Sequence, residues 1–189
     1  VFTIGKLLDL AGREPGRFRH IRHLALVNDY LLSRLAGKAA MPADWSSASL
    51  TGLLATGGFQ WALPILAAVG LPRAALPDLA PPGRPVGVLS SAAARATGLP
   101  AGLPLVTGAG DHQCAGLGAG AIAPGLVEIT LGTSAVALTA APRFMPDPRQ
   151  RLMCCAHGFP GAWNLEGLQN AVGSALGWGR RLLNRSTVP

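Results

Sequence analysis

The stretch that decides the fold spans residues 103–138 and reads LPLVTGAGDHQCAGLGAGAIAPGLVEITLGTSAVAL. It opens with a short apolar run, 103–107, followed by a glycine cluster, a pattern typical of a buried strand. Asp111 then begins a short helix of small residues. Two further apolar runs, 126–130 and 135–138, are separated by a turn sequence and indicate a β-hairpin. A strand, a helix and a hairpin in this order predict an α/β protein.

The residues before this stretch are mainly helical in pattern, and those after it mix strands with one helix. Apolar spacing and capping residues predict helices over 4–10, 20–35, 61–69, 90–97 and 169–183. Further strands are predicted over 152–156 and 163–165. The serine-rich residues 44–51 predict a loop with a capped turn. Because helices come first and hairpins later, we place a domain boundary near 118–124.

Composition excludes disorder and argues against a nucleic-acid partner. Of the 189 residues 49% are hydrophobic and 13% are charged, which is enough apolar material for a sizeable core. The net charge of +7 comes almost entirely from arginine. The arginines are scattered, and the densest group, at Arg17, Arg19 and Arg22, has little aromatic interleaving. We therefore predict no nucleic-acid binding.

The cysteines favour a reducing, cytoplasmic location. Cys114, Cys154 and Cys155 are an odd number with an adjacent pair, and no leader segment precedes them, so a disulfide framework is not predicted. Cys154, Cys155 and His157 do not have the spacing of a tetrahedral zinc site, and we predict no metal site from them. Polar residues break the apolar stretch 103–141, so no membrane span is predicted.

Asp111 is the first candidate for chemistry. A carboxylate that follows a strand and two glycines lies where open α/β sheets place ligands, and glycine lets a substrate approach the backbone. Such a carboxylate can accept the proton of an attacking hydroxyl in phosphoryl transfer. The same position suits an N-cap for the helix that follows. The residues by themselves leave both roles open.

The turn Leu131-Gly132-Thr133-Ser134 is the second candidate. Consecutive backbone N–H groups and two hydroxyls can form a nest for phosphate oxygens, although an ordinary hairpin turn has the same sequence features. The chain has no Gly-Lys-Ser/Thr phosphate loop and no complete dinucleotide fingerprint. Ser134 lacks the flanking glycine of a hydrolase nucleophile elbow.

These features belong to an ordered set of short motifs that spans most of the chain. In chain order the set is Lys6-Leu7-Leu8, Asn28-Asp29-Tyr30-Leu31, Leu35-x-Gly37, Asp44-x-Ser46-x-Ala48-Ser49-x-Thr51, Trp61, Thr97-Gly98-Leu99-Pro100, Gly110-Asp111, Leu131-Gly132-Thr133-Ser134 and Trp163-x-Leu165-Glu166-Gly167. The order and spacing of the set resemble the FGGY family of carbohydrate kinases.

The resemblance implies an actin-like (ribonuclease H-like), two-lobed α/β fold and ATP-dependent phosphorylation of a sugar or polyol. It implies that Asp111 is the general base and contacts the substrate together with His112. Gly132, Thr133 and Ser134 would hold ATP phosphates, with Gly173 against the nucleotide and Mg²⁺ as the accompanying ion. His112 departs from the commonest family choice, which leaves the identity of the sugar open.

The resemblance also implies an incomplete catalytic apparatus. The family's first phosphate turn, its sugar-gripping residues and its adenine-binding segment have no counterpart here, so both ends are expected to be cuts and the chain alone is expected to be inactive. Residues 1–120 are interpreted as the second half of the N-terminal substrate lobe and 121–189 as the beginning of the C-terminal nucleotide lobe. The oligomeric state is left open, with a homodimer considered. Alternatives are a non-catalytic actin-like ATP-binding module and, more distantly, a serine hydrolase using Ser134.

Overall fold

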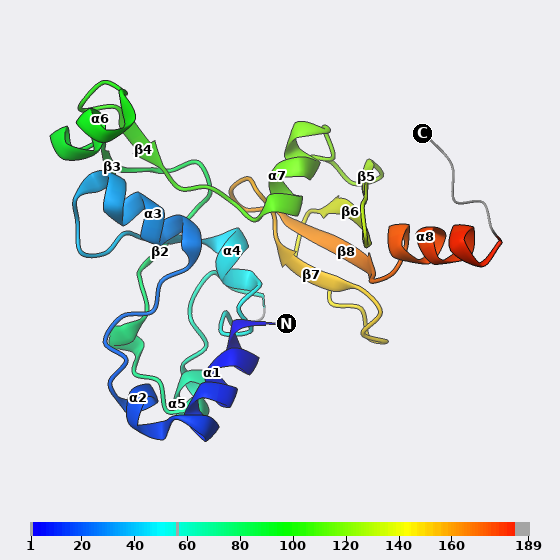
Figure 1. Ribbon diagram of the computed structural model, residues 1–189, viewed down its shortest axis with the longest axis horizontal. Coiled ribbons are helices and arrows are strands. Elements are labelled where there is room, and N and C mark those ends of the chain that lie inside the picture. Colours follow the sequence, from blue (N-terminus) through cyan, green and yellow to red (C-terminus); the bar gives the residue numbers. More distant parts are fainter. Residues whose placement is uncertain (1, 56, 184–189) are drawn as a thin grey trace. The chain divides into compact units, whose positions relative to one another are not determined.

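Figure 1 shows the computed structural model, which describes residues 2–55 and 57–183. The chain divides into two compact units. The first consists of Val1–Gly110 with Ala156–Gly161, and the second of Asp111–Cys155 with Ala162–Pro189.

The first unit is mostly helical. Its helices are α1 (Thr3–Arg13), α2 (Pro15–Arg19), α3 (Val27–Ala36), α4 (Trp45–Ser49), α5 (Leu63–Val69) and α6 (Ser91–Thr97), with a 3₁₀ turn at Arg73–Ala75. Its short strands are β1 (Ala43–Asp44), β2 (Leu79–Ala80), β3 (Pro85–Val88) and β4 (Pro104–Val106). Strands β1 and β2 pair in parallel, and β3 and β4 pair antiparallel. The larger apolar core of this unit contains Leu7, Phe18, Leu53, Trp61 and Leu66.

Three of the predicted elements of the first unit differ from the structure. Residues 44–51, predicted as a loop, contain the helix α4. The helix predicted over 20–35 begins only at Val27, because residues 21–26 form no helix and the N–H of Leu24 donates to the carbonyl of Ala75 at 2.7 Å. Apolar periodicity does not distinguish such a packed non-helical segment from a helix. The strand predicted over 103–107 exists as β4, but only Leu105 of its three residues is buried. By contrast, the helix predicted over 90–97 is confirmed as α6, and the hydroxyl of Ser90 caps it by accepting from the N–H of Ala93 at 3.2 Å.

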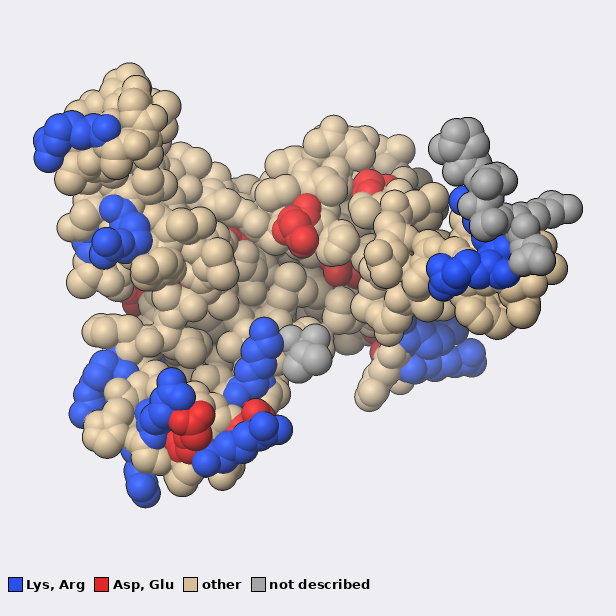
Figure 2. All heavy atoms as spheres, viewed as in Figure 1, with Lys and Arg blue, Asp and Glu red and all other residues tan. Residues whose placement is uncertain are grey.

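Two local ion pairs lie along α1 and the start of α2. Arg13 lies 2.7 Å from Asp9 and Arg17 lies 2.7 Å from Glu14, and all four side chains are solvent-exposed. Figure 2 shows basic and acidic side chains intermixed over α1 and α2. Exposed pairs of this kind contribute little to stability, about 0–1 kcal/mol each.

The second unit is a four-stranded sheet with two helices. It contains α7 (Asp111–Gly118), β5 (Val127–Leu131), β6 (Ala135–Ala141), β7 (Met153–Ala156), β8 (Trp163–Gln169) and α8 (Gly173–Leu182), and the strand order is β5-β6-β8-β7. The predicted hairpin is confirmed, because β5 and β6 pair antiparallel and Leu131 lies opposite Ala135. The predicted final helix begins four residues later than expected, because Trp163–Gln169 continues as a strand.

Helix α7 packs against β5 and β6. Residues at alternate positions of the strands face it, and among them Val136 and Leu138 of β6 are buried. A Cβ atom on Gly116 of α7 would lie 2.7 Å from Cδ2 of Leu138, which is fully buried. Glycine at this position therefore lets the helix approach the sheet closely.

We predict that Gly116→Ala destabilises the second unit by about 1–3 kcal/mol, because the added methyl group overpacks a buried contact. Gly118→Ala on the same helix is the matched control, since nothing lies within 4 Å of its Cβ position. The control is expected to be neutral or to stabilise by up to about 1 kcal/mol through helix propensity. Urea unfolding curves of the two variants provide the measurement. Equal stabilities would contradict the close approach.

Candidate active site

The first turn of α7 presents the predicted catalytic residue. Asp111 is exposed, and its Oδ1 accepts from the N–H of His112 at 2.8 Å. The aspartate is the first residue of the helix, and its carboxylate meets the adjacent N–H rather than the N–H two or three residues further on that an N-cap side chain engages. His112 is half-buried, and the next residue, Gln113, is fully buried. One turn of helix therefore carries a solvent-facing carboxylate and a side chain anchored inside the unit.

The anchor is a buried polar cluster that the sequence analysis did not single out as functional. The Nε2 of Gln113 donates to Oε1 of Glu166, and the same oxygen accepts from Nδ2 of Asn164 at 2.9 Å. All three side chains are buried, Glu166 with 4% of its surface exposed. Asn164 and Glu166 occupy alternate positions of β8, so they share the face that α7 covers. Polar residues at inward positions of an apolar strand were the sequence signal that could have identified them.

Burial raises the pKa of Glu166 above its ordinary value, and the charge of Asp111 acts in the same direction. The hydrogen bonds from Asn164 and Gln113 and the charge of His112 oppose this increase in the pKa. These interactions place Glu166 within the electrostatic reach of the exposed end of α7.

The predicted phosphate turn lies against the beginning of α8. The N–H of Gly173 donates to the carbonyl of Gly132 at 3.1 Å, and the N–H of Val172 donates to the carbonyl of Thr133 at 2.9 Å. A Cβ on Gly173 would lie 2.5 Å from the Gly132 carbonyl oxygen, so the turn and helix meet through a position that only glycine fills. Gly173 thus contacts the turn that the sequence analysis assigned to nucleotide binding.

The turn has hydrogen-bond donors that suit an anion, but one of the expected backbone N–H groups is already used within the turn. The N–H of Gly132 donates to the carbonyl of Ser134 at 2.8 Å within the turn. Thr133 is exposed, and no hydrogen bond among residues 2–55 and 57–183 engages its hydroxyl or N–H. Together with the positive end of the α8 helix dipole, these groups fit phosphate oxygens.

The structure brings together the predicted site residues in two groups. Asp111 and His112 form one, and Gly132, Thr133, Ser134 and Gly173 form the other. Within the described ranges, no hydrogen bond or ion pair joins the two groups. Figure 1 shows α8 extending from the end of β8, apart from the start of α7.

The first unit has its own buried polar framework, built from motif residues. Nδ2 of Asn28 donates to Oδ2 of Asp44 and to Oγ of Ser47, the latter at 3.0 Å. Asp44 also caps α4 by accepting from the N–H of Ser47 at 2.7 Å, which confirms the predicted capped turn. Oγ of Ser46 accepts from the N–H of Gly110 at 3.0 Å. The framework therefore fixes the glycine segment that ends the first unit.

Asp29, in the first turn of α3, is the most perturbed carboxyl of this framework. It is 3% exposed, and its Oδ1 is buried without a hydrogen-bond partner among the residues that the structure describes. Burial raises its pKa from 3.8 to about 6, and the charge of Asp44 adds to the increase, while the N–H groups of Asp29 and Leu26 oppose it.

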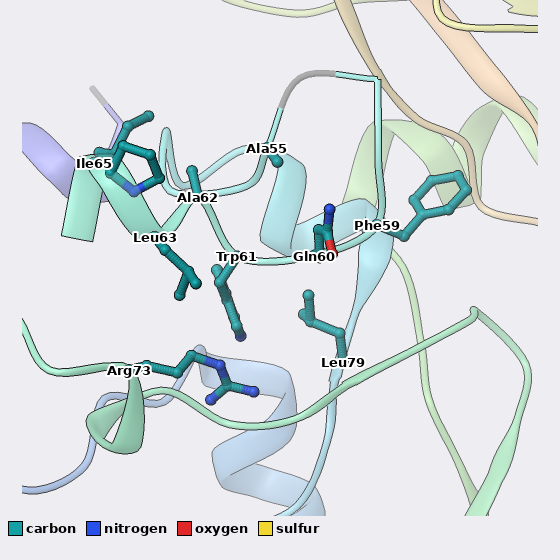
Figure 3. A pocket seen from close by; sticks show the side chains of 10 residues that line it. Ala55, Phe59, Gln60, Trp61, Ala62, Leu63, Ile65, Arg73 and Leu79 are labelled. Atoms are coloured by element: carbon teal, nitrogen blue, oxygen red, sulfur yellow. The ribbon is translucent and has the colours of Figure 1, made fainter. Parts of the chain in front are cut away.

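The first unit also contains a hollow of about 730 Å³ that the sequence analysis did not predict. Figure 3 shows its mainly apolar lining, with Trp61, Leu79 and Arg73 around the opening. Arg73 is engaged there, because it donates to the carbonyl of Leu76 at 2.9 Å and pairs with Asp78 at 3.1 Å. The predicted site residues do not line this hollow.

Within residues 2–55 and 57–183, no group of three or more His, Cys, Asp or Glu residues is placed to hold a metal ion. None of the helices described is both long and apolar enough to cross a membrane.

The chain has the fold of a segment of an actin-like sugar kinase. It superimposes on the crystal structure of a xylulose kinase from Brucella ovis with a TM-score of 0.90 and 31% sequence identity, covering 97% of this chain and 37% of that one. The sequence model for the N-terminal domain of the FGGY family of carbohydrate kinases matches residues 1–118. The chain therefore belongs to the FGGY family of carbohydrate kinases, as the motifs indicated.

Curated relatives carry two different names. A xylulose kinase of Escherichia coli K12 is 32% identical over 188 residues, which are 100% of this chain and 38% of that protein. An autoinducer-2 kinase of Klebsiella pneumoniae is 30% identical over 175 residues, which are 93% of this chain and 32% of that protein. The chain thus spans about a third of the length of the curated relatives that it matches.

We predict that stability falls as pH rises through the titration range of Asp29. Its folded pKa of about 6 is above the ordinary 3.8, so the folded state binds the proton more tightly. The stabilisation is complete below about pH 3.8, is lost as pH rises towards 6, and amounts to at most about 3 kcal/mol. Asp29→Asn should remove this part of the pH dependence, measured by urea unfolding from pH 4 to 7.5. Asp9→Asn, at an exposed position, is the control and should retain it. A wild-type slope in Asp29→Asn would refute the assignment.

We predict that Gly173→Ala displaces the β5–β6 turn from α8, because the methyl group meets a backbone oxygen that has little freedom to move. The expected cost is about 1–3 kcal/mol, with changed amide chemical shifts at Gly132 and Thr133. Gly179→Ala in the same helix has open space at its Cβ position and should leave those shifts unchanged. NMR spectra and thermal melts of both variants test the contact.

Proposed function

We propose that this chain is part of an ATP-dependent carbohydrate kinase that phosphorylates a hydroxyl of a sugar or polyol. The observation that carries the proposal is Asp111, an exposed carboxylate at the start of a helix whose first turn is anchored inside the second unit. Membership of the FGGY family supports the reaction class. A hydroxyl held beside Asp111 can lose its proton as it attacks a phosphoryl group.

In the proposed reaction the substrate oxygen forms a bond to the γ-phosphorus of ATP, and the bond from that phosphorus to the β,γ-bridging oxygen breaks. The substrate proton moves to the carboxylate of Asp111, and ADP leaves with the electron pair of the broken bond. His112, one residue further along α7, lies where it can contact the same substrate. Positioning of these groups supplies much of the rate.

The nucleotide phosphates are assigned to the turn Gly132, Thr133 and Ser134, with Gly173 fixing the turn against α8. The unengaged N–H and hydroxyl of Thr133 and the amino end of α8 support this assignment. Mg²⁺ would neutralise charge on the phosphates when bound, and none of the steps described here depends on how it is held.

We further propose that residues 1–120 form the second half of the N-terminal lobe and 121–189 the beginning of the C-terminal lobe. The match of the family's N-terminal domain to residues 1–118 supports the first assignment. No disulfide joins Cys114, Cys154 and Cys155 in the part of the chain that the structure describes, which supports a cytoplasmic location. A ketopentose is the first substrate to test, since a xylulose kinase is 32% identical to this chain.

The 189-residue chain is expected to show no sugar-dependent ATP consumption by itself. Phosphoryl transfer needs groups on both sides of the γ-phosphate, and the residues described here supply a base and one phosphate turn. The test therefore uses a protein in which this sequence is completed to the length of its relatives. The substrates assayed are xylulose, other pentuloses, autoinducer-2, gluconate and glycerol.

In that protein Asp111→Asn is expected to lower kcat by about a hundredfold or more, because the amide retains the shape but does not accept the proton. ATP affinity, measured by calorimetry, should change less than about threefold. Asp9→Asn, at an exposed position of α1, is the control and should keep wild-type turnover. Near-normal turnover of Asp111→Asn, after mass spectrometry has excluded deamidation, would rule out the base assignment. An inactive wild type on every substrate would count against the proposed reaction.

A further inference from the structure

We propose that Glu166 is a positioning residue for Asp111, acting through the hydrogen bond from Gln113. The inference rests on the proposed function and adds a residue that touches neither sugar nor nucleotide. Its role is to fix the first turn of α7 on the sheet.

The contacts define a connection from strand to helix. Glu166 lies in β8 opposite Leu138 of β6, and Leu138 is the residue that Gly116 of α7 approaches. Gln113 reaches Glu166 from the first turn of the same helix. Helix α7 is thus held at two points, by apolar packing at Gly116 and by a hydrogen bond at Gln113. Asp111, two residues before Gln113, lies beyond the second point.

The apolar contact alone leaves the beginning of α7 without a directional restraint. Packing against Leu138 is non-directional, whereas a hydrogen bond to a charged acceptor fixes both distance and angle. The bond from Gln113 acts on the turn that carries Asp111, and Asn164 holds the same Glu166 oxygen from within β8. The carboxylate is therefore fixed to the strand and restrains the helix.

Burial of Glu166 is costly and is not explained by the stability of the sheet. A buried carboxylate is generally less stable than an apolar residue of the same size. In addition, Oε1 of Gln113 and Oδ1 of Asn164 are buried without a hydrogen-bond partner among the described residues. Buried polar atoms without a partner occur beside functional groups, and Oε2 of Glu128 is another among the described residues.

Glu128 provides an internal comparison. It lies in β5 opposite Leu138, on the same face of the sheet as Glu166. Its Oε1 accepts from the hydroxyl of Thr130 on its own strand at 2.6 Å. Two acidic residues thus flank one buried leucine, and of these Glu166 is the one that receives a hydrogen bond from α7. The charged groups around Glu166 are Asp111 and His112 of α7, with Glu128 across the sheet.

The experiment uses the completed protein and compares Glu166→Leu, Glu166→Gln, Gln113→Met and the matched control Glu128→Leu. Glu166→Leu and Gln113→Met are each expected to lower kcat by about 10- to 100-fold, because small displacements of a reacting group have effects of this size. The KM values for ATP and sugar should stay within about twofold of wild type. The double variant should be no slower than the slower single variant, because both changes break one connection.

Glu166→Gln is expected to recover most of the wild-type kcat, since its amide oxygen can still accept from Gln113 and Asn164. Its amide N–H₂ can also donate to one of the two unpartnered oxygens. Glu128→Leu should retain wild-type kcat. Three outcomes would overturn the positioning role. In the first, Glu166→Gln loses as much kcat as Glu166→Leu. In the second, KM rises in parallel with the loss of kcat, and in the third, Glu128→Leu loses kcat to the same extent.

A second measurement is independent of turnover. Hydrogen exchange at the amides of Ala115, Gly116 and Leu117, which follow the first turn of α7 and donate to its carbonyl groups, should accelerate about tenfold or more in Gln113→Met and Glu166→Leu, and remain unchanged in Glu128→Leu. If the wild type is inactive but these local changes occur, the proposed function fails and the connection between β8 and α7 stands. If exchange is unchanged in a folded Gln113→Met protein, the inference fails whatever the activity. Should Glu166→Leu not fold, Gln113→Met and Glu166→Gln still decide the outcome.

Discussion

The close approach of α7 to the four-stranded sheet is the constraint on which the arrangement of the second unit depends. It exists because Gly116 presents no side chain to the fully buried Leu138. Once the helix lies at this depth, Gln113 is within hydrogen-bonding reach of Glu166, and Asp111 remains at the surface. The absence of a side chain at Gly116 thus allows both the polar cluster and the orientation of the proposed base.

The same physical device recurs at the other end of β8. Gly173 allows the beginning of α8 to donate two backbone hydrogen bonds to the carbonyl groups of Gly132 and Thr133. The hairpin turn is therefore held by its carbonyl groups. The hydroxyl and N–H of Thr133 have no hydrogen-bond partner among the described residues. Glycine thus permits the close approach at both groups of site residues, at Gly116 for α7 and at Gly173 for the hairpin turn.

Buried carboxylates in the two units illustrate different outcomes of the same energetic problem. Asp44 is stabilised by Asn28 and by the N–H of Ser47, although burial still raises its pKa. Asp29 has fewer partners, and its pKa rises to about 6. Glu166 lies between these cases, with two amide donors on one oxygen. Burial of an acid is tolerated in proportion to the donors that surround it.

The sequence by itself determined the elements with local signals: the hairpin over 126–138, the capped turn within 44–51, the helix over 90–97, the helix that Asp111 opens, and membership of the FGGY family through ordered motifs. These depend on neighbouring residues and can be recognised without knowing the fold. Only the tertiary structure decided that residues 21–26 form no helix, that Gly173 touches Gly132, and that Gln113 meets Glu166 across 53 positions of the chain. Such contacts depend on how closely a helix and a sheet approach, which local sequence patterns do not encode.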